Sequence, residues 1–223
     1  MYKNINLEIE ENRTVRKIDF KVINLFCCGF TGRNQDAVKA HVDEMRCIGV
    51  PCPDRIPDIY HVSPYLLTNE TEIDVVGKHT SGEVESVFLL DHNQVFLTVG
   101  SDHTDREIER LNYQKSKQIC SKIISNHVWK FSEVDDHFDD LLLRSEVVKN
   151  GKQYLYQEGK VSIVMKPFDV INHFKISDNK TVFFSGTIPT KTKKIIHADY
   201  YMIEIFDPIL NRRITHSYKV RVI

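Results

Sequence analysis

Three carboxylates and a histidine surround two apolar runs in the segment SGEVESVFLLDHNQVFLTVGSDHTDRE, residues 81–107. Glu83 and Glu85 stand two residues apart where the first run begins. Side chains two apart on a strand point to the same face, so these two carboxylates would lie side by side. Neighbouring carboxylates repel each other, and the pair therefore requires a counter-charge.

A third carboxylate joins this pair if the two apolar runs form a β-hairpin. A turn at the polar residues 91–94 would let the second run return beside the first and bring Asp102 next to Glu83 and Glu85. Such hard oxygen ligands suit Mg²⁺, Mn²⁺ or Ca²⁺, and three protein ligands leave positions open for water and a chelating substrate. A solvated strand face with Asp102 as a helix N-cap fits the same spacing, so spacing alone leaves both interpretations open.

A helix is predicted before this segment and another after it. Residues 34–48 have helical apolar spacing that ends at Gly49 and Pro51, and His41 and Glu44 share a face of that helix. After the second apolar run, the polar residues from Thr104 onward turn helical as far as Ile123, with Thr104 as the cap before Glu107. Asp102 is therefore expected at a strand-to-helix corner.

The remaining segments predict an α+β, strand-rich fold without repeats. Residues 5–28 alternate apolar and polar positions and indicate a hairpin whose second strand ends at Cys28-Gly29. Proline punctuates residues 51–68 and favours an extended connection. One short helical piece is expected at residues 168–174. The later strands are expected at residues 141–148, 154–157, 161–165, 181–184, 201–206 and 213–222.

Composition excludes several classes of function. Thirty Lys and Arg against 31 Asp and Glu give a net charge of −1, which supplies no bulk attraction to nucleic acid or to an anionic membrane. No stretch approaches the roughly 20 apolar residues that span a bilayer, and the first residues lack a signal peptide, so we expect a cytoplasmic protein. The five cysteines lack zinc-site spacing, and we expect most of them to be buried thiols.

The carboxylate segment resembles signatures of the fumarylacetoacetate hydrolase superfamily. Residues 82–85, GEVE, resemble the family's E-P-E-x-A-x-V-I-G, and residues 101–107, SDHTDRE, resemble N-D-V-S-A-R-D with the aspartate, the arginine and the final acid in register. The resemblance implies that Glu83, Glu85 and Asp102 ligate a metal ion. Mg²⁺ or Mn²⁺ is the implied cofactor, with Ca²⁺ as a further candidate.

Landmarks on both sides of this segment follow in the family's order. Residues 41–44, HVDE, resemble N-Y-x-x-H-A-x-E-x-G, in which a His-Glu dyad activates water, and this dyad falls on His41 and Glu44. Residues 181–189, TVFFSGTIP, resemble D-V-I-L-T-G-T-P-A-G, whose Gly-Thr helps to hold the substrate. Gly186 and Thr187 take that role by resemblance, although a plain turn at the end of a strand is the alternative.

Within the superfamily, the chain most resembles a group of bacterial proteins of unknown function. That group carries G-[FY]-T-G-R, T-S-G-E-V-E, V-G-S-D-H-T-D-R-E and S-K-Q-x-C, which recur here almost unaltered. The family's catalytic lysine falls on Lys117 if the S-K-Q-x-C form is followed, and Lys115 is the alternative. The interval between Glu85 and Asp102 is 17 residues, much shorter than in the superfamily.

The resemblance implies a divalent-metal-dependent hydrolase or lyase that acts on a small 2-oxo or 1,3-dicarbonyl carboxylic acid. The reaction would pass through a metal-stabilised enolate and end in C–C bond hydrolysis, decarboxylation or hydration. His41 would accept a proton from water while Glu44 orients its ring, and Lys117 would supply positive charge to an oxyanion. Arg33 or Arg106 would clamp a substrate carboxylate.

Several alternatives stay open for these residues. His41 and Glu44 could be an ordinary pair on a helix surface. Arg106 could tie the Asp102 corner to a carboxylate such as Glu107 or Asp105 instead of contacting a substrate. His103 could support a ligand, be a fourth ligand or be exposed. The rival function is a non-catalytic metal- or ligand-binding protein that retains the fold.

The expected architecture is a fumarylacetoacetate-hydrolase-like mixed β-sandwich roll with a few short helices. An N-terminal β-hairpin, residues 1–26, would pack on a single domain of residues 27–223. The expected partners are a small oxo-acid substrate and, because superfamily members usually pair, a second copy in a homodimer.

Overall fold

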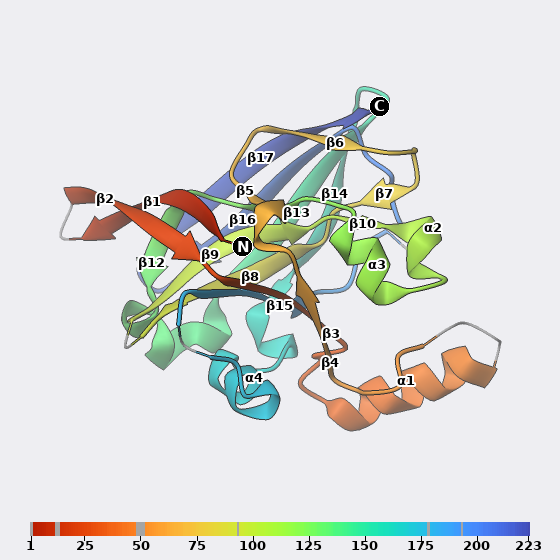
Figure 1. Cartoon of the computed structure of the whole chain (residues 1–223), viewed down its shortest axis with the longest axis horizontal. Helices are drawn as coiled ribbons and strands as arrows, with labels where there is room; N and C mark the ends of the chain where they lie inside the picture. Colours follow the sequence, from red (N-terminus) through yellow and green to blue (C-terminus); the bar gives the residue numbers. More distant parts are fainter. Residues whose placement is uncertain (1, 12–13, 48–51, 93, 178, 193) are drawn as a thin grey trace.

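The computed structural model describes residues 2–11, 14–47, 52–92, 94–177, 179–192 and 194–223. Two large β-sheets account for most of it, and short helices surround their edges (Figure 1). The strand-rich α+β class predicted from the sequence is confirmed.

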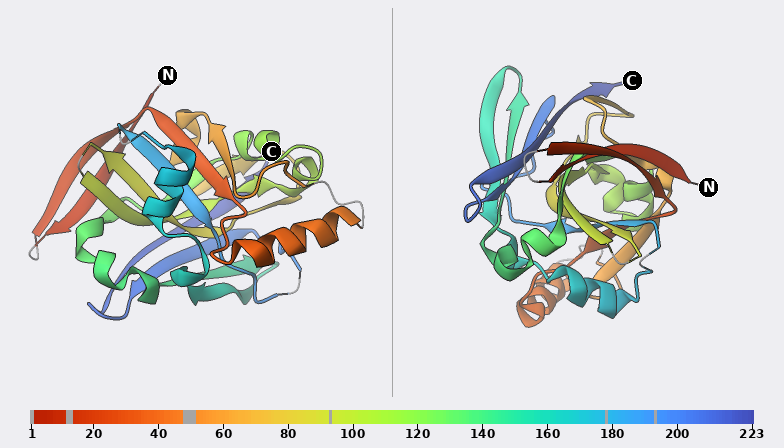
Figure 2. Two further views of the ribbon diagram at one scale, coloured as in Figure 1. Left: turned by 90° about the horizontal axis from the view of Figure 1, so that it is seen from below. Right: turned by 90° about the vertical axis from the view of Figure 1, so that its left-hand side faces the viewer.

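The larger sheet has ten strands and curls strongly (Figure 2). Its strand order is β2-β1-β12-β9-β8-β15-β3-β4, and in addition β11 pairs with β9 and β5 pairs with β11. The sheet is mixed, because β1 runs parallel to β12 and β15 runs parallel to β3. The strands are β1 (Lys3–Glu11), β2 (Thr14–Val22), β3 (Asn24–Gly29), β4 (Asp58–Val62), β5 (Leu67–Thr68), β8 (Val84–Asp91), β9 (Gln94–Asp102), β11 (Lys122–Ile124), β12 (His127–Lys130) and β15 (Thr181–Thr187).

A five-stranded sheet packs against one face of the larger sheet, and two short strands form a separate antiparallel pair. The five strands follow the order β14-β13-β16-β17-β6. They are β6 (Glu72–Val75), β13 (Leu142–Lys149), β14 (Lys152–Lys160), β16 (Tyr200–Asp207) and β17 (Arg212–Val222), and the pair is β7 (Thr80–Ser81) with β10 (Thr104–Asp105). The helices are α1 (Gln35–Cys47), α2 (Arg106–Glu109), α3 (Tyr113–Gln118) and α4 (Pro167–Phe174), with 3-10 turns at η1 (Pro64–Leu66), η2 (Phe131–Glu133), η3 (Asp135–Asp140) and η4 (Val161–Ile163).

Strand β8 is buried on both faces, which explains its continuous apolar run. Phe88 and Leu90 join a core cluster that also contains residues of the five-stranded sheet, such as Ile203. Val87 and Leu89 face the opposite way, into a cluster built entirely from the curled sheet. Burying an apolar side chain of this size contributes about 1.5–3 kcal/mol, so both faces fix the register of β8.

The predicted hairpin between the two apolar runs is confirmed. Strands β8 and β9 pair antiparallel in an unbroken register from Val84 opposite Ser101 to Asp91 opposite Gln94. The turn residue Asn93 lies outside the described residues, as do the predicted helix-ending residues 48–51.

Two predicted elements are wrong in extent near the chain's start and middle. The second opening strand ends at Val22, and residues 24–29 form β3, which pairs with β15 and β4 elsewhere in the sheet. Residues 161–163 form a 3-10 turn where a strand was expected. Apolar alternation indicates extended chain, but it does not show where one strand ends and the next strand begins.

The helix predicted after Gly100 is also interrupted. Asp105, and not Thr104, caps its start by accepting hydrogen bonds from the N–H groups of Glu107 and Ile108, each at 2.9 Å. Asn112 then caps a second helix, and the chain enters strand β11 at residue 122. The Asn112 side chain accepts a hydrogen bond from the N–H of Lys115, so a new helix begins there and the predicted helix is divided in two.

Among the described residues, the model contains no helix that is long and apolar enough to cross a membrane. Three of the five cysteines, Cys27, Cys28 and Cys120, are buried, as the sequence predicts for most of them, whereas Cys47 is exposed. Burial raises the pKa of the Cys27 and Cys28 thiols well above its usual value.

Candidate metal centre

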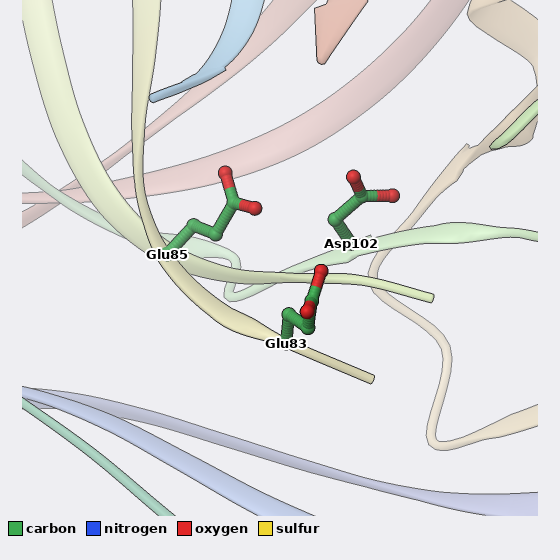
Figure 3. A group of neighbouring side chains, drawn as sticks. All are labelled: Glu83, Glu85 and Asp102. Atoms are coloured by element: carbon green, nitrogen blue, oxygen red, sulfur yellow. The ribbon is translucent and has the colours of Figure 1, made fainter. Parts of the chain in front are cut away.

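Glu83, Glu85 and Asp102 point toward one another at one end of the hairpin (Figure 3). One carboxylate oxygen from each lies within 4.8 Å of the other two, which is the arrangement expected for ligands that share one ion. The backbone ties the hairpin together at this end, because the N–H of Asp102 donates to the carbonyl of Glu83 at 3.0 Å. The sequence therefore predicted the convergence of the three carboxylates correctly.

Alternation along β8 explains why Glu85 is buried. Glu85 lies on the same face as Val87 and Leu89, which line the inside of the curled sheet. Glu85 is 2% exposed, whereas the side chain of Glu83, which directly precedes the first residue of β8, is 24% exposed. The pair is thus asymmetric, with one carboxylate inside the protein and one at the rim.

Arg106 supplies the counter-charge for Glu83. Its Nη2 lies 3.1 Å from Glu83 Oε1, its Nη1 lies 2.8 Å from Glu109 Oε2, and its Nε donates to Ser81 Oγ at 2.7 Å. Burial alone would lower the pKa of the guanidinium, but the two carboxylates outweigh burial and raise it. Arg106 therefore ties the strand-to-helix corner to carboxylates, as one alternative from the sequence proposed, although Glu107 is not its partner.

Asp102 is paired with two lysines. Lys122 stands directly opposite it on the neighbouring strand β11 and places its Nζ 2.9 Å from Oδ1, and Lys117 pairs with Oδ2. Burial alone would raise the pKa of Asp102, but the two ammonium groups lower it below its usual value. Asp102 is consequently held ionised inside the protein.

Glu85 has no cationic partner of this kind among the described residues. Its one hydrogen bond comes from the backbone N–H of Gly186, at 2.7 Å to Oε2. Burial, reinforced by the charge of Asp102, raises the pKa of Glu85 well above its usual value. The charge of Lys117 offsets this shift only in part, and Glu85 has no ion-pair partner among the described residues. A divalent ion between the three carboxylates would supply a close counter-charge.

Glu83 and Glu85 line a pocket of about 230 Å³, and Lys117 lies between this pocket and the buried Asp102. Aromatic rings line one side of the pocket: Tyr60 stacks on Tyr113 with ring centroids 6.1 Å apart, and Phe30 meets Tyr113 edge-on at 5.8 Å. The Lys117 ammonium lies 5.6 Å from the Tyr60 ring centroid. The complete lining is residues 28–32, Tyr60, Glu83, Glu85, Glu109, Tyr113, Lys117, Gly186 and Thr187.

Gly186 and Thr187 lie in this pocket, but their polar groups are already engaged. The Gly186 N–H binds Glu85, and the Thr187 hydroxyl donates to the carbonyl of Val84 at 2.8 Å. Gly186 has φ +100°, and a Cβ there would meet Thr31 Oγ1 at 2.0 Å, so only glycine fits. In this arrangement the pair positions the end of β8, and its substrate-binding role stays a prediction.

His103 points away from the carboxylates. Its ring is completely buried, with Nδ1 3.1 Å from the Tyr218 hydroxyl and Nε2 2.9 Å from Thr80 Oγ1. Burial, followed by the charges of Lys122 and Arg106, lowers the pKa of His103 to about 3. The neutral ring of His103 links Thr80 of β7 with Tyr218 of β17 in the five-stranded sheet, which places it outside the ligand set.

The remaining predicted residues are not brought to this pocket. His41 and Glu44 are exposed on α1, with side-chain exposures of 69% and 80% and 3.9 Å between Nδ1 and Oε2. Arg33 makes a two-point ion pair with Asp139, at 2.7 and 2.8 Å, and donates to the carbonyl of Val164. The roles proposed for these residues in catalysis and substrate binding stay predictions.

Lys122, Tyr60 and Tyr113 were not singled out from the sequence, although they surround the site. Lys122 had one signal, since it stands alone at the start of the apolar run Ile123-Ile124, where a charge is costly unless paired. The two tyrosines carried no signal that separates them from ordinary core aromatics. Of the two candidate lysines, Lys117 is buried in the site and Lys115 is exposed.

Comparison with known proteins places this site in context. Residues 28–218 match the model of a family described as "Protein of unknown function (DUF2848)". A search among curated proteins gave no match.

Solved structures share the fold over nearly the whole chain. A structure of Cg1458 with inhibitor is 18% identical, with a TM-score of 0.67 over 94% of this chain and 81% of that one. 2-Keto-3-deoxy-D-arabinonate dehydratase complexed with magnesium and 2,5-dioxopentanoate is 17% identical, with a TM-score of 0.57 over 95% and 86%. Fumarylacetoacetate hydrolase from the psychrophilic Exiguobacterium antarcticum is 12% identical, with a TM-score of 0.55 over 98% and 100%. The fumarylacetoacetate hydrolase fold predicted from the motifs is confirmed.

Proposed function

The chain belongs to the DUF2848 family and has the fold of the fumarylacetoacetate hydrolase superfamily, and from this starting point we propose that it is a divalent-metal-dependent hydrolase or lyase. Its substrate would be a small 2-oxo or 1,3-dicarbonyl carboxylic acid. The observation that carries the proposal is the buried carboxylate of Glu85, which lies close to those of Glu83 and Asp102 and has no ion-pair partner among the described residues.

The donor set agrees with a hard cation. Glu83, Glu85 and Asp102 would hold Mg²⁺ or Mn²⁺, with Ca²⁺ as a further candidate, and the pocket beside them has room for a small chelating acid. The dehydratase that shares this fold was solved with magnesium and 2,5-dioxopentanoate, which supports both the metal and the substrate class. When bound, the ion would polarise a substrate carbonyl and offset the negative charge that develops on its oxygen.

The protein's own residues would orient and stabilise the substrate. Lys117 lines the pocket, and because Asp102 raises its pKa well above the usual value in spite of burial, it stays an ammonium and would stabilise an oxyanion. The aromatic side of the pocket would exclude water from the reacting atoms. We keep His41 and Glu44 as the proposed water-activating dyad on the strength of the motif resemblance.

The exposure of that dyad favours a second candidate function, a non-catalytic metal- or ligand-binding protein that retains the fold. His41 and Glu44 lie on the outer surface of α1, where a surface ion pair explains them equally well. The two functions differ in turnover and agree on metal binding.

Two experiments separate these functions. Titration of Mg²⁺ and Mn²⁺ into the metal-free protein is expected to show binding that Glu85→Ala abolishes, while Glu107→Ala, an exposed acid nearby, leaves it unchanged. Equal metal binding by the wild type and both variants would contradict the proposed metal site. A screen of 2-oxo and 1,3-dicarbonyl acids should then identify a substrate that the wild type turns over. His41→Ala is expected to lose this turnover and to keep its metal affinity, and unchanged turnover would contradict the role of the dyad.

Three related expectations stay predictions. The homodimer can be checked by analytical ultracentrifugation, the choice between Mg²⁺, Mn²⁺ and Ca²⁺ by competitive titration, and the cytoplasmic location by fractionation.

A further inference from the structure

The two lysines on Asp102 differ in their access to the pocket. Lys122 is completely buried and is held twice, by Asp102 Oδ1 at 2.9 Å and by the carbonyl of His103 at 2.6 Å. Lys117 pairs with Oδ2, and it also lines the pocket on the side of Tyr60 and Glu109. One ammonium is thus fixed in the protein, and the other stands between Asp102 and the cavity.

A metal ion and the Lys117 ammonium compete for the same carboxylate. Glu83, Glu85 and Asp102 can share one ion only if an oxygen of Asp102 faces that ion. Both carboxylate oxygens of Asp102 are already paired with a lysine ammonium group. A divalent ion beside a lysine cation in a site this buried would experience strong repulsion. Of the two lysines, only Lys117 has a cavity into which it can move.

We propose that Lys117 is a displaceable counter-cation that occupies the pocket side of Asp102 until a metal ion binds. Metal binding then moves its ammonium group away from Asp102 and into the pocket, while Lys122 stays in place. This inference rests on the metal site of the proposed function and adds the order of events, in which the ion binds first and the lysine becomes available afterwards.

The charges around the site support this exchange. With a divalent ion bound, four ionised carboxylates (Glu83, Glu85, Asp102 and Glu109) face the ion and three cations (Arg106, Lys117 and Lys122), which leaves one positive charge in excess. A displaced Lys117 carries that positive charge to the pocket, where a singly charged acid substrate would neutralise it.

The surroundings of Lys117 provide a place for the displaced group. The negative charges of Glu83 and Glu109 already act on its ammonium, and the Tyr60 ring lies 5.6 Å away. A lysine side chain has four rotatable bonds, so the ammonium can reach these neighbours while the backbone of α3 stays where it is. The movement therefore requires a change of rotamer and no rearrangement of the fold.

The experiment measures the affinity for Mg²⁺ and Mn²⁺ alone, by calorimetric titration of the metal-free protein and its variants. Lys117→Met removes the competing cation and is expected to bind Mn²⁺ at least about tenfold more tightly than the wild type, because close buried charges couple by this amount or more. Lys117→Arg keeps a cation at the position and is expected to bind no more tightly than wild type. Lys115→Met, an exposed lysine on the same helix, is the matched control and is expected to leave the affinity unchanged.

A second measurement covers the case in which Lys117→Met is too unstable for titration. Lys117→Gln also removes the charge but keeps a polar end group, and Mg²⁺ is expected to raise its melting temperature more than that of the wild type. Equal or weaker metal binding by folded Lys117→Met or Lys117→Gln, with normal binding by wild type, would overturn the displacement and leave the proposed function standing. No metal binding by any folded variant or by wild type would overturn both.

Discussion

Replacing Glu85 with glutamine tests whether this buried acid is an unpaired charge. Below its usual pKa of 4.5, Glu85 is protonated in both the folded and the unfolded chain. The fold raises this pKa, so at higher pH the folded protein keeps a proton that the unfolded chain has lost. The unfolded state then binds fewer protons, and the free energy of unfolding falls as the pH rises through and above 4.5.

The magnitude follows from what surrounds the carboxylate. The charge of Lys117 and the N–H of Gly186 offset the burial of Glu85 only in part, and the nearby charge of Asp102 adds to the cost of ionisation. A buried group left this poorly paired costs about 1–3 kcal/mol, and each unit of pKa corresponds to about 1.4 kcal/mol. Glu85→Gln, which is neutral and keeps the acceptor for Gly186, is therefore expected to raise the free energy of unfolding of the metal-free protein by about 2 kcal/mol at pH 8. This corresponds to a melting temperature higher by about 4–8 °C for a chain of this length.

The assay is urea denaturation of both proteins in the presence of a chelator, between pH 4 and pH 8. The two curves should coincide at the acidic end and separate as the pH rises. Saturating Mg²⁺ should reverse the order, because the wild type gains binding free energy, about 2.7 kcal/mol at a hundredfold excess over Kd, and the variant does not. Glu83→Gln is the control, and it should destabilise the protein because Glu83 is paired with Arg106. A metal-free Glu85→Gln protein that is less stable than wild type at pH 8 would refute the reasoning, since it would mean that Glu85 is ionised and well compensated.

Three further substitutions test how the site is held. Lys122→Met should lower the free energy of unfolding by about 3 kcal/mol, because it removes a buried cation from Asp102, and a loss below about 1 kcal/mol in urea denaturation would contradict this. Gly186→Ala should lower the free energy of unfolding by about 1–3 kcal/mol, since the φ of +100° and the nearby Thr31 leave no room for a Cβ. It should also weaken Mn²⁺ binding, and an unchanged affinity in a titration would contradict the role of Gly186 in positioning Glu85. Arg33→Ala should lower the free energy of unfolding by no more than about 1 kcal/mol, because Arg33 pairs with the half-exposed carboxylate of Asp139. If Arg33 clamps a substrate carboxylate, the same variant should raise the KM of an acid substrate, and an unchanged KM would contradict that role.

The carboxylate convergence could be predicted because it depends on local chain geometry. Two apolar runs of similar length joined by a short polar turn have one simple pairing, and the alternation of side chains then fixes which residues share a face. Glu83, Glu85 and Asp102 lie at the ends of those runs, so their positions followed from the hairpin alone. The motif resemblance added the order of the more distant landmarks, and hence the fold.

The partners of these carboxylates could not be predicted, because they depend on pairing between strands far from the hairpin turn. Lys122 reaches Asp102 because β11 lies beside β9, and Gly186 reaches Glu85 because β15 lies beside β8. The sequence around Lys122 and Gly186 does not indicate which strand will pair with β11 or with β15. The same limit explains β3, which continues the alternation of the opening hairpin but belongs to the other end of the sheet.

The helical residues show the opposite difficulty. His41 and Glu44 share a helix face, as their spacing predicts, yet spacing does not determine whether that face meets the pocket or the solvent. Arg33 likewise belongs to a motif that resembles the family's signature, and the structure gives it a carboxylate partner 106 positions later in the chain. Residue type and spacing identified candidates in both cases, and tertiary contacts decided where they lie.

The origin of the pocket's parts along the chain has a consequence for redesign. The charged groups, from Glu83 to Lys122, are encoded in one stretch of forty residues, whereas the walls, Tyr113 excepted, come from residues 28–32, Tyr60 and the end of β15. Part of the wall can therefore be varied separately, since exchanging Phe30 changes the shape presented to a ligand without replacing a residue that contacts the carboxylates or their lysines. A library confined to the walls would sample new specificities on a constant ion site.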